Sequence, residues 1–314
     1  MGNEEQKEIR AGYTDTITAL AAKNKNIVVL EADLMSCTNT GNFKNTYPNQ
    51  FYNAGIAEAN MVGIAAGLSA MGKIPFAASF GCFSSRRVYD QFFISANYAR
   101  LNVKLIGTDP GVTAAMNGGT HMPFEDIALM QAIPNLTIIE PTDYYSCAAL
   151  IKEAAENYGC VYFRFPRKPV PVIYNDKETF KFGQSKLIKE GKDCCFIALG
   201  SLLLNEALKA RETLASEGID AGVLDVLSIK PLDKETILDI AGKVKAVITA
   251  ENAQLDGGFG STVAALLAEN GFKGRFGRIG IQNEFGEVGT QDYLAKRFGL
   301  TAEKLAEKAR DILK

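Results

Sequence analysis

Short apolar runs alternate with amphipathic stretches through the first half of the chain. The runs are rich in β-branched and aromatic side chains and cover 27–30, 74–77, 103–106, 136–139 and 161–163. Between them, apolar positions recur with helical spacing at 11–23, 57–71, 84–99, 124–132 and 143–157. Strands that alternate with helices are typical of βα units. The pattern predicts a doubly wound, mainly parallel sheet with its ligand-binding residues after the strands or at helix N-termini.

A second alternating series follows a break in the pattern. Residues 168–183 contain two prolines and mixed charges without a sustained period, which is typical of a linker. The new series begins at Cys194–Leu199 and ends in helices after residue 290. We therefore predict an α/β chain of two doubly wound domains, at residues 1–170 and 187–314, joined by a linker at 171–186. The second domain is the smaller of the two.

Composition is that of a globular protein with two cores. The 314 residues are 47% hydrophobic and 22% charged, and 34 basic residues nearly balance 36 acidic ones. This balance lacks the basic surface that a nucleic-acid-binding protein needs. The longest weakly polar stretch, Met61–Met71, is too short to span a membrane, and the charged N-terminus has no signal-peptide core. We expect a cytoplasmic protein.

Cysteine and histidine limit the metal chemistry of the chain. The six cysteines form no C-x-x-C pair, so we expect small buried thiols in a reducing compartment and not a zinc site or a disulfide framework. The only histidine is His121. The chain alone therefore cannot build a metal site from histidines, and we expect it to bind no metal by itself.

One acidic residue, Glu58, begins a predicted helix of small and apolar residues. A glutamate in a first helical turn is most often a solvated group that the helix dipole favours. Here the apolar neighbours predict burial, and a buried carboxyl group needs a partner or keeps its proton. Such a group is suited to sharing a proton with a heterocyclic nitrogen.

Two further segments place candidate side chains after predicted strands. Phe80 and Phe83 lie where a ligand ring would stack, although two phenylalanines are more often ordinary core residues. Beside them, Arg86 and its neighbour Arg87 either begin a solvated helix or reach an anionic substrate. A Gly-rich loop at 109–126 ends near His121, which suits hydrogen bonding or proton transfer but is also compatible with a capping role.

Two weaker segments are compatible with anion binding. Arg167 follows the last predicted strand of the first domain and either binds an anion or flanks the linker. The turn at 256–262 (DGGFGST) precedes a helix but lacks both a Walker ending and the G-x-G-x-x-G spacing. Tight packing of helix against sheet explains that turn without a nucleotide.

The order of four motifs resembles the transketolase family of thiamine-diphosphate enzymes. These are IAEA at 56–59, SFGCF at 79–83, GGTHMPFED at 118–126 and IEPTD at 139–143. The match runs over nearly the whole chain but covers only the second half of a full-length transketolase. It implies a pyrimidine-binding domain followed by a transketolase C-terminal domain. The family's diphosphate- and Mg²⁺-binding domain has no counterpart here, so the resemblance implies the carboxyl-terminal subunit of a split enzyme.

The resemblance also implies roles for individual residues. Glu58 corresponds to the glutamate that contacts N1′ of the cofactor pyrimidine, and His121 to a histidine that faces the reacting oxygens of the substrate. The remaining residues divide into cofactor contacts (Phe80, Phe83, Asp33, Leu34) and substrate contacts (Arg10, Asn117, Arg86, Arg167). Arg10 and Arg167 correspond to arginines that hold the far end of a phosphorylated sugar.

Three positions depart from the family pattern. Asn117 stands where an aspartate usually contacts the sugar C2 hydroxyl, Asp109 replaces a second histidine of the phosphate site, and Cys37 replaces a serine. The carboxylate of Asp109 would repel an anion at the phosphate site unless a cation lies between them. We therefore expect an altered sugar specificity, such as a branched or differently substituted sugar.

The function implied is ketol transfer by a heteromeric enzyme. With a partner subunit that binds Mg²⁺, the chain would pass a two-carbon unit from an anionic ketose to an aldose through a thiamine diphosphate adduct. We expect a homodimer within an α2β2 assembly, with helix 57–71 at the interface. The alternatives are the beta subunit of a 2-oxo acid dehydrogenase, a non-catalytic partner subunit and, less favoured, a deoxyxylulose-phosphate synthase.

Overall fold

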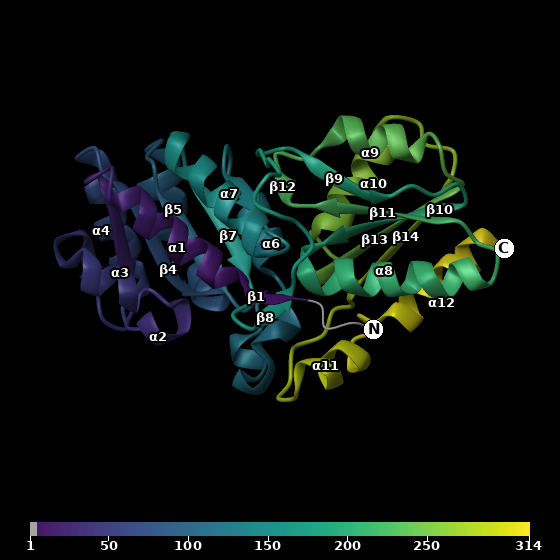
Figure 1. Ribbon diagram of the computed structural model, residues 1–314, viewed down its shortest axis with the longest axis horizontal. Coiled ribbons are helices and arrows are strands. Elements are labelled where there is room, and N and C mark those ends of the chain that lie inside the picture. Colours follow the sequence, from purple (N-terminus) through teal and green to yellow (C-terminus); the bar gives the residue numbers. More distant parts are fainter. Residues whose placement is uncertain (1–4) are drawn as a thin grey trace. The chain divides into compact units, whose positions relative to one another are not determined.

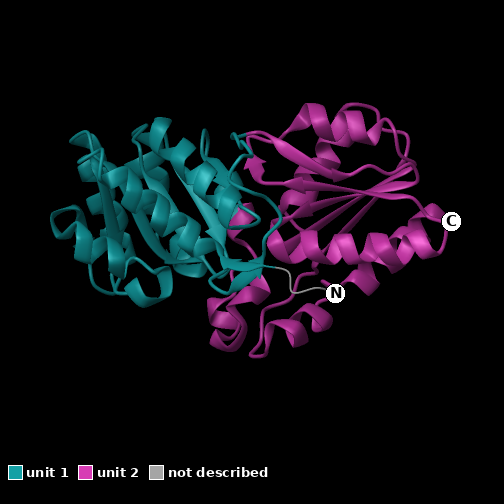
Figure 2. Cartoon of the chain, in the orientation of Figure 1, with its two compact units in different colours: residues 1–110, 129–182 teal, residues 111–128, 183–314 magenta. Residues whose placement is uncertain are grey.

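The computed structural model describes residues 5–314 and divides into two compact units (Figure 2). Unit 1 comprises the residues up to 110 together with 129–182, and unit 2 comprises 111–128 and 183–314. The predicted charged N-terminus falls partly on residues 1–4, which lie outside the described residues. Among residues 5–314, no helix is long and apolar enough to cross a membrane.

Unit 1 is built on a parallel sheet with the strand order β6-β7-β5-β4-β2-β3 (Figure 1). Three of these strands are buried at every position, as expected for strands that are covered on both faces. The bounds are β2 Ile27–Glu31, β3 Phe51–Asn53, β4 Ile74–Phe80, β5 Lys104–Thr108, β6 Thr137–Ile139 and β7 Val161–Phe165. The predicted parallel α/β architecture is confirmed.

Helices connect these strands, and α1, α4, α6 and α7 lie at predicted places, whereas α2 and α3 were not predicted. They are α1 Ile9–Ala21, α2 Met35–Thr38, α3 Gly41–Thr46, α4 Glu58–Ala70, α5 Tyr89–Gln91 and α7 Tyr144–Glu156, while α6 Asp126–Gln131 starts in unit 2 and ends in unit 1. Helices α1 and α7 pack closely because Gly12 has no side chain. A Cβ atom there would lie 2.5 Å from the carbonyl oxygen of Tyr144.

The stretch predicted as one helix at 84–99 is irregular. Wide π-helical turns at Phe83–Arg87 and Phe92–Tyr98 flank the short helix α5. At its start, Ser84 and Ser85 donate hydrogen bonds to backbone carbonyl groups 22 and 4 residues away. Hydroxyl groups that compete for carbonyls loosen a regular helix, and π-helical turns are frequent at functional sites.

A two-stranded ribbon ties the beginning of unit 1 to its end. Strand β1 (Gln6–Glu8) pairs antiparallel with β8 (Pro169–Pro171), so that Glu8 lies opposite Pro169. Part of the predicted linker is therefore a strand. Because Arg10 follows β1 and Arg167 precedes β8, the ribbon brings these two arginines to the same region of unit 1.

Unit 2 is a five-stranded sheet with the order β14-β13-β10-β11-β9, in which only β9 is antiparallel (Figure 1). Its strands are β9 Ser185–Lys189, β10 Cys194–Leu199, β11 Ala221–Val226, β13 Ala246–Gln254 and β14 Arg275–Ile281, with β12 at Ser228–Lys230. Its helices are α8 Gly200–Ser216, α9 Lys234–Ala241, α10 Phe259–Glu269, α11 Gln291–Arg297 and α12 Ala302–Leu313. The strand predicted at Cys194–Leu199 and the helices predicted after residue 290 are present.

Candidate active site

The carboxyl ends of four neighbouring strands converge on one edge of the unit 1 sheet. Phe80, Thr108 and Phe165 end β4, β5 and β7, and they lie side by side in the strand register. Glu31 ends β2, the next strand beyond β4. In a parallel sheet this edge is where ligands bind. The segments that leave these strands carry most of the candidate residues of unit 1.

Glu58 begins α4 and is buried, as its apolar neighbours predict: 1% of its surface is exposed. Its Oε2 accepts a hydrogen bond from Nη1 of Arg87 at 2.9 Å, and Ser79 Oγ lies 3.5 Å from Oε1. The side chain of Arg87 is 47% exposed. The buried carboxylate is thus balanced by a cation that reaches in from the surface.

Two aromatic rings lie beside this pair. Phe80 and Phe83 meet edge to face with their centroids 6.1 Å apart. The guanidinium of Arg87 lies 4.1 Å from the centroid of Phe83, and that of Arg167 lies 5.0 Å from the centroid of Phe80. These rings therefore connect Glu58 with the arginine cluster described next.

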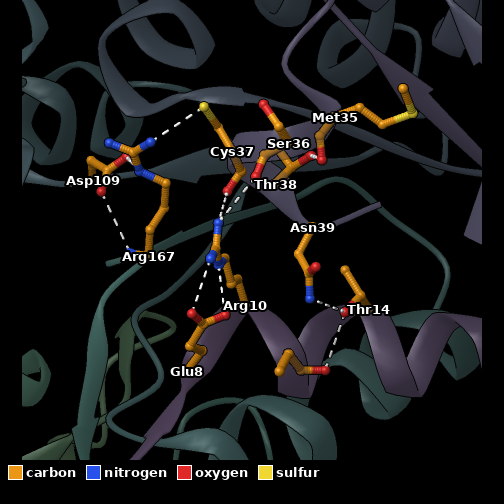
Figure 3. Close-up of polar contacts among 11 residues, drawn as sticks. Glu8, Arg10, Thr14, Met35, Ser36, Cys37, Thr38, Asn39, Asp109 and Arg167 are labelled. Atoms are coloured by element: carbon orange, nitrogen blue, oxygen red, sulfur yellow. Dashed lines mark hydrogen bonds and ion pairs between the residues drawn. The ribbon is translucent and has the colours of Figure 1, made fainter. Parts of the chain in front are cut away.

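All three nitrogen atoms of the Arg10 guanidinium donate hydrogen bonds (Figure 3). Its Nε and Nη2 donate to the two carboxylate oxygens of Glu8 at 2.8 and 3.0 Å. Its Nη1 donates to the carbonyl oxygens of Cys37 at 2.8 Å and of Ser36 at 3.3 Å. The fixed guanidinium therefore attaches the short helix α2 to the start of α1.

Arg167 forms the second half of the same cluster. Its Nε lies 2.5 Å from Oδ2 of Asp109, and its Nη1 donates to Sγ of Cys37 at 3.2 Å. Burial raises the pKa of the Asp109 carboxyl to about 6, although Arg167 acts in the opposite direction. The cation that an anion would require beside Asp109 is therefore present.

Asp33 and Leu34 lie in the turn after β2. Asp33 is exposed with a φ of 63°, in the left-handed region, and it exchanges two hydrogen bonds with Asn53 at 3.0 and 3.1 Å. Leu34 is half-buried and precedes α2. Arg86 is exposed and lies beside Cys82. The cofactor and substrate roles of these three residues stay predictions.

Glu31 is a residue that the sequence analysis missed. It is fully buried at the end of β2, and its Oε1 accepts hydrogen bonds from Thr38 and Thr40 at 2.6 and 2.8 Å. Burial raises the pKa of this carboxyl to about 7, while the two hydroxyl groups lower it. Glu31 thus holds the turn that carries Cys37. A lone acid that ends an apolar strand was the signal in the sequence.

His121 and Asn117 belong to unit 2, in the segment 111–128. The segment forms 3₁₀ turns at Gly111–Asn117 and Gly119–His121, and Oγ1 of Thr120 lies 2.9 Å from Nδ1 of His121. A Cβ atom on Gly119 would lie 2.0 Å from the carbonyl oxygen of Gly286. The glycines before His121 thus allow close packing on the turn at 286, a role that the sequence analysis did not foresee.

The Gly-rich turn at 256–262 has no room for a phosphate at its backbone N–H groups. The carboxylate of Glu251, which is fully buried, accepts from the N–H of Phe259 at 2.7 Å and of Gly260 at 2.8 Å. A Cβ atom on Gly258 would lie 2.3 Å from the same carboxylate. The chain fills this helix N-terminus with its own anion, in agreement with the packing role predicted from the sequence.

Two family models account for almost all of the described chain. Residues 5–172 match the model described as transketolase, pyrimidine binding domain. Residues 183–305 match the model described as transketolase, C-terminal domain. Together they agree with the order of domains that the motifs predicted.

Relatives of similar length support the same assignment. A protein of Clostridium sp. (strain MSTE9) named 6-deoxy-6-sulfo-D-fructose transketolase subunit SqwH is 44% identical over 98% of this chain and 95% of its own. A Methanocaldococcus jannaschii protein named putative transketolase C-terminal section is 41% identical over 98% of this chain and 97% of its own. A solved structure titled "Split gene transketolase, inactive beta4 tetramer" has a TM-score of 0.90 at 37% identity, covering 98% of this chain and 99% of that one.

Proposed function

Because the chain belongs to the transketolase family, we propose that it is one subunit of a two-chain enzyme that moves a two-carbon ketol unit from a ketose to an aldose. The observation that carries the proposal is the environment of Glu58. A buried carboxylate lies beside two aromatic rings, and its cationic partner is half exposed and can be exchanged for a ligand. An ion pair that only stabilises the fold requires neither the two aromatic rings nor a half-exposed cation.

The residues around Glu58 fit the aminopyrimidine of thiamine diphosphate. A carboxyl group suits a ring nitrogen that exchanges a proton, and aromatic side chains suit the faces of a heterocycle. When bound, the cofactor supplies the carbon nucleophile for cleaving and forming the carbon–carbon bond. Glu58 would hold a proton at N1′ of the pyrimidine, and Phe80 and Phe83 would pack against the ring. Asp33 and Leu34 would lie near the thiazolium.

The substrate contacts are proposed from the same family. His121 would donate a hydrogen bond to the reacting oxygens of the sugar, where developing charge needs stabilisation. Asn117 would contact a sugar hydroxyl without adding charge, and Arg10 and Arg167 would hold an anionic group at the far end of the ketose. The sulfosugar in the name of the Clostridium relative agrees with such an anionic end.

The assembly is the remaining part of the proposal. Among residues 5–314, no group of three or more His, Cys, Asp or Glu side chains could hold a metal ion. From the resemblance to split transketolases, we propose that the partner subunit supplies the Mg²⁺ and diphosphate contacts. We propose a dimer of this chain, with α4 at the interface, inside an α2β2 complex. Size-exclusion chromatography of the mixed subunits tests that stoichiometry.

Reconstitution tests the proposed function. The chain is mixed with a candidate partner subunit that carries the diphosphate- and Mg²⁺-binding domain, thiamine diphosphate and Mg²⁺, and two-carbon transfer from a ketose to an aldose is measured. We expect turnover by the mixture, none by either chain alone, and a loss of about 1,000-fold in Glu58→Ala. Asp15→Asn removes an exposed carboxylate from α1 and serves as the control. Turnover by Glu58→Ala equal to the parent, or acceptance of the two-carbon unit by a lipoyl group only, contradicts the proposal.

A further inference from the structure

Five residues form what we call the two-arginine cluster: Glu8, Arg10, Cys37, Asp109 and Arg167. They come from the β1–β8 ribbon, α1, α2 and the segments that follow β5 and β7 (Figure 3). The inference below rests on the proposed function, in which this cluster holds the far end of the ketose. It concerns which anion the cluster accepts.

The charges of the cluster cancel within the chain. Arg10 is paired on both carboxylate oxygens with Glu8, and Arg167 is paired with Asp109. Two cations and two carboxylates leave no net charge to balance a ligand. A dianion would therefore gain little attraction overall, and it would approach a carboxylate that is only 3% exposed and cannot turn away into water.

The two arginines differ in what they can still donate. Arg10 uses all three nitrogen atoms in contacts with Glu8, Ser36 and Cys37. Arg167 uses Nε and Nη1 within residues 5–314, so its Nη2 is the nitrogen left for a ligand oxygen. The cluster thus offers hydrogen bonds from one half-buried guanidinium, beside a fixed carboxylate.

We propose that Asp109 makes the two-arginine cluster select a ketose whose far end carries a single negative charge, a sulfonate, over the same ketose with a dianionic phosphate. A sulfonate keeps three acceptor oxygens for Arg167 and has half the charge to oppose Asp109. An uncharged hydroxymethyl end lacks the attraction to the guanidinium. Asp109 is accordingly a specificity-determining residue.

The ionisation of Asp109 fits this assignment at neutral pH. With a pKa near 6, the carboxyl is charged above pH 7 and takes up a proton below pH 6. The charged and titratable groups that face it are Arg167, Arg10 and, through Arg167, Cys37. Phosphate esters also become monoanions near pH 6, so selectivity is best measured at pH 8, where both groups are ionised.

The test compares three donors that differ only at carbon 6. The reconstituted holoenzyme is assayed at pH 8 with 6-deoxy-6-sulfofructose, fructose 6-phosphate and fructose. We expect kcat/KM to be at least about 10-fold higher for the sulfonate than for the phosphate, equal to roughly 1.4 kcal/mol. In Asp109→Asn we expect the sulfonate-to-phosphate ratio to fall at least about 10-fold, mainly through KM for the phosphate.

Two controls separate charge from other effects. Cys37→Ser alters the cluster without changing its charge, so the ratio should move less than about threefold. Asp15→Asn removes one carboxylate from the same helix as Arg10, outside the cluster, and should leave both the ratio and the turnover unchanged. Thermal unfolding shows whether Asp109→Asn is folded, and the ratio in the parent enzyme tests the preference for a sulfonate without any variant.

A binding measurement keeps this inference separate from the proposed function. Methanesulfonate and methyl phosphate are titrated calorimetrically into the holoenzyme at pH 8, and tighter binding of the sulfonate is expected. If no ketose is turned over, the proposed function fails and the titration alone decides the selectivity. A parent enzyme that prefers phosphate or fructose, or a ratio that Asp109→Asn leaves unchanged, overturns the inference while ketol transfer stands.

Discussion

Two buried glutamates lie at helix N-termini in the two units, and their partners differ in kind. Glu58 in unit 1 is paired with the side chain of Arg87, which is about half exposed. Glu251 in unit 2 is hydrogen-bonded to the backbone N–H groups of Phe259 and Gly260. A side chain can leave its partner when a ligand arrives, whereas the backbone of a packed helix cannot. The difference separates a carboxylate that is available for chemistry from one that caps a helix.

The same difference explains why a Gly-rich turn is a weak indication of a ligand site. The turn at 256–262 has the glycines and the helix that a phosphate site needs, but Glu251 occupies its donors. The edge of the unit 1 sheet has fewer glycines and more charged side chains, several of them half exposed. Whether the hydrogen-bond donors of a turn are still available to a ligand therefore indicates function better than the Gly-rich sequence does.

The largest expected change in stability comes from substituting Glu251. Glu251→Ala leaves two buried N–H groups without their acceptor and opens a cavity, so we expect the free energy of unfolding to fall by about 4 kcal/mol. Urea unfolding followed by circular dichroism measures the loss. The folded fraction should keep parental turnover in the reconstituted enzyme. Lost turnover at unchanged stability would place Glu251 in the chemistry and would break the comparison.

A third buried carboxylate, Glu31, gives the next effect, because its partners are hydroxyl groups and not a cation. Its pKa is raised from 4.5 to about 7, so the folded state binds a proton that the unfolded state has lost between these values. The contribution of Glu31 to stability is complete below pH 4.5, and about 3 kcal/mol of it is lost as the pH rises to 7.

Glu31→Gln tests that pH dependence. The amide is neutral at every pH, so the variant should lose less stability than the parent between pH 5 and pH 8 in urea unfolding. Asp176→Asn, which removes an exposed carboxylate of unit 1, is the control and should follow the parent curve. Parallel curves for Glu31→Gln and the parent would mean that Glu31 is ionised in the folded protein throughout this range.

Local periodicity is sufficient to predict most of the fold and the position of Glu58. The strands and helices alternate strongly enough that the predicted second series of strands and helices is present in unit 2, from Cys194–Leu199 to the helices after residue 290. Burial of Glu58 follows from the small apolar residues around it in α4. These features depend on residues that are neighbours in the sequence, and for that reason a pattern can predict them.

The parts that were missed depend on residues that are distant in the sequence. The Glu8–Arg10 pair lies near Arg167 because β1 pairs with β8, and the prolines in β8 conceal that strand in the sequence. Arg87 reaches Glu58, 29 residues away, from a wide π-helical turn that helical periodicity does not predict. Residues 111–128 pack on the rest of unit 2 through Asn252 and Gly286, which lie more than 100 residues away in the sequence.

The smallest expected effect tests the ion pair that defines the unit 1 side of the comparison. Arg87→Met leaves the Glu58 carboxylate buried with only a long contact to Ser79, so we expect a loss of about 2 kcal/mol. In a Glu58→Gln background the same substitution should cost about 0.5 kcal/mol, because no charge remains to be balanced. The difference is the coupling free energy, and it is below that of a fully buried pair because Arg87 is half exposed.

Urea unfolding of the four proteins in this cycle at pH 8 measures the coupling. The exposed pair Arg310–Glu217 in unit 2 provides a matched control, and its cycle should give a smaller value. Equal costs of Arg87→Met in both backgrounds would mean that Arg87 does not stabilise the carboxylate. Glu58 would then resemble Glu251, because neither carboxylate would depend on a cationic side chain. The two glutamates would no longer differ in having a partner that a ligand can replace.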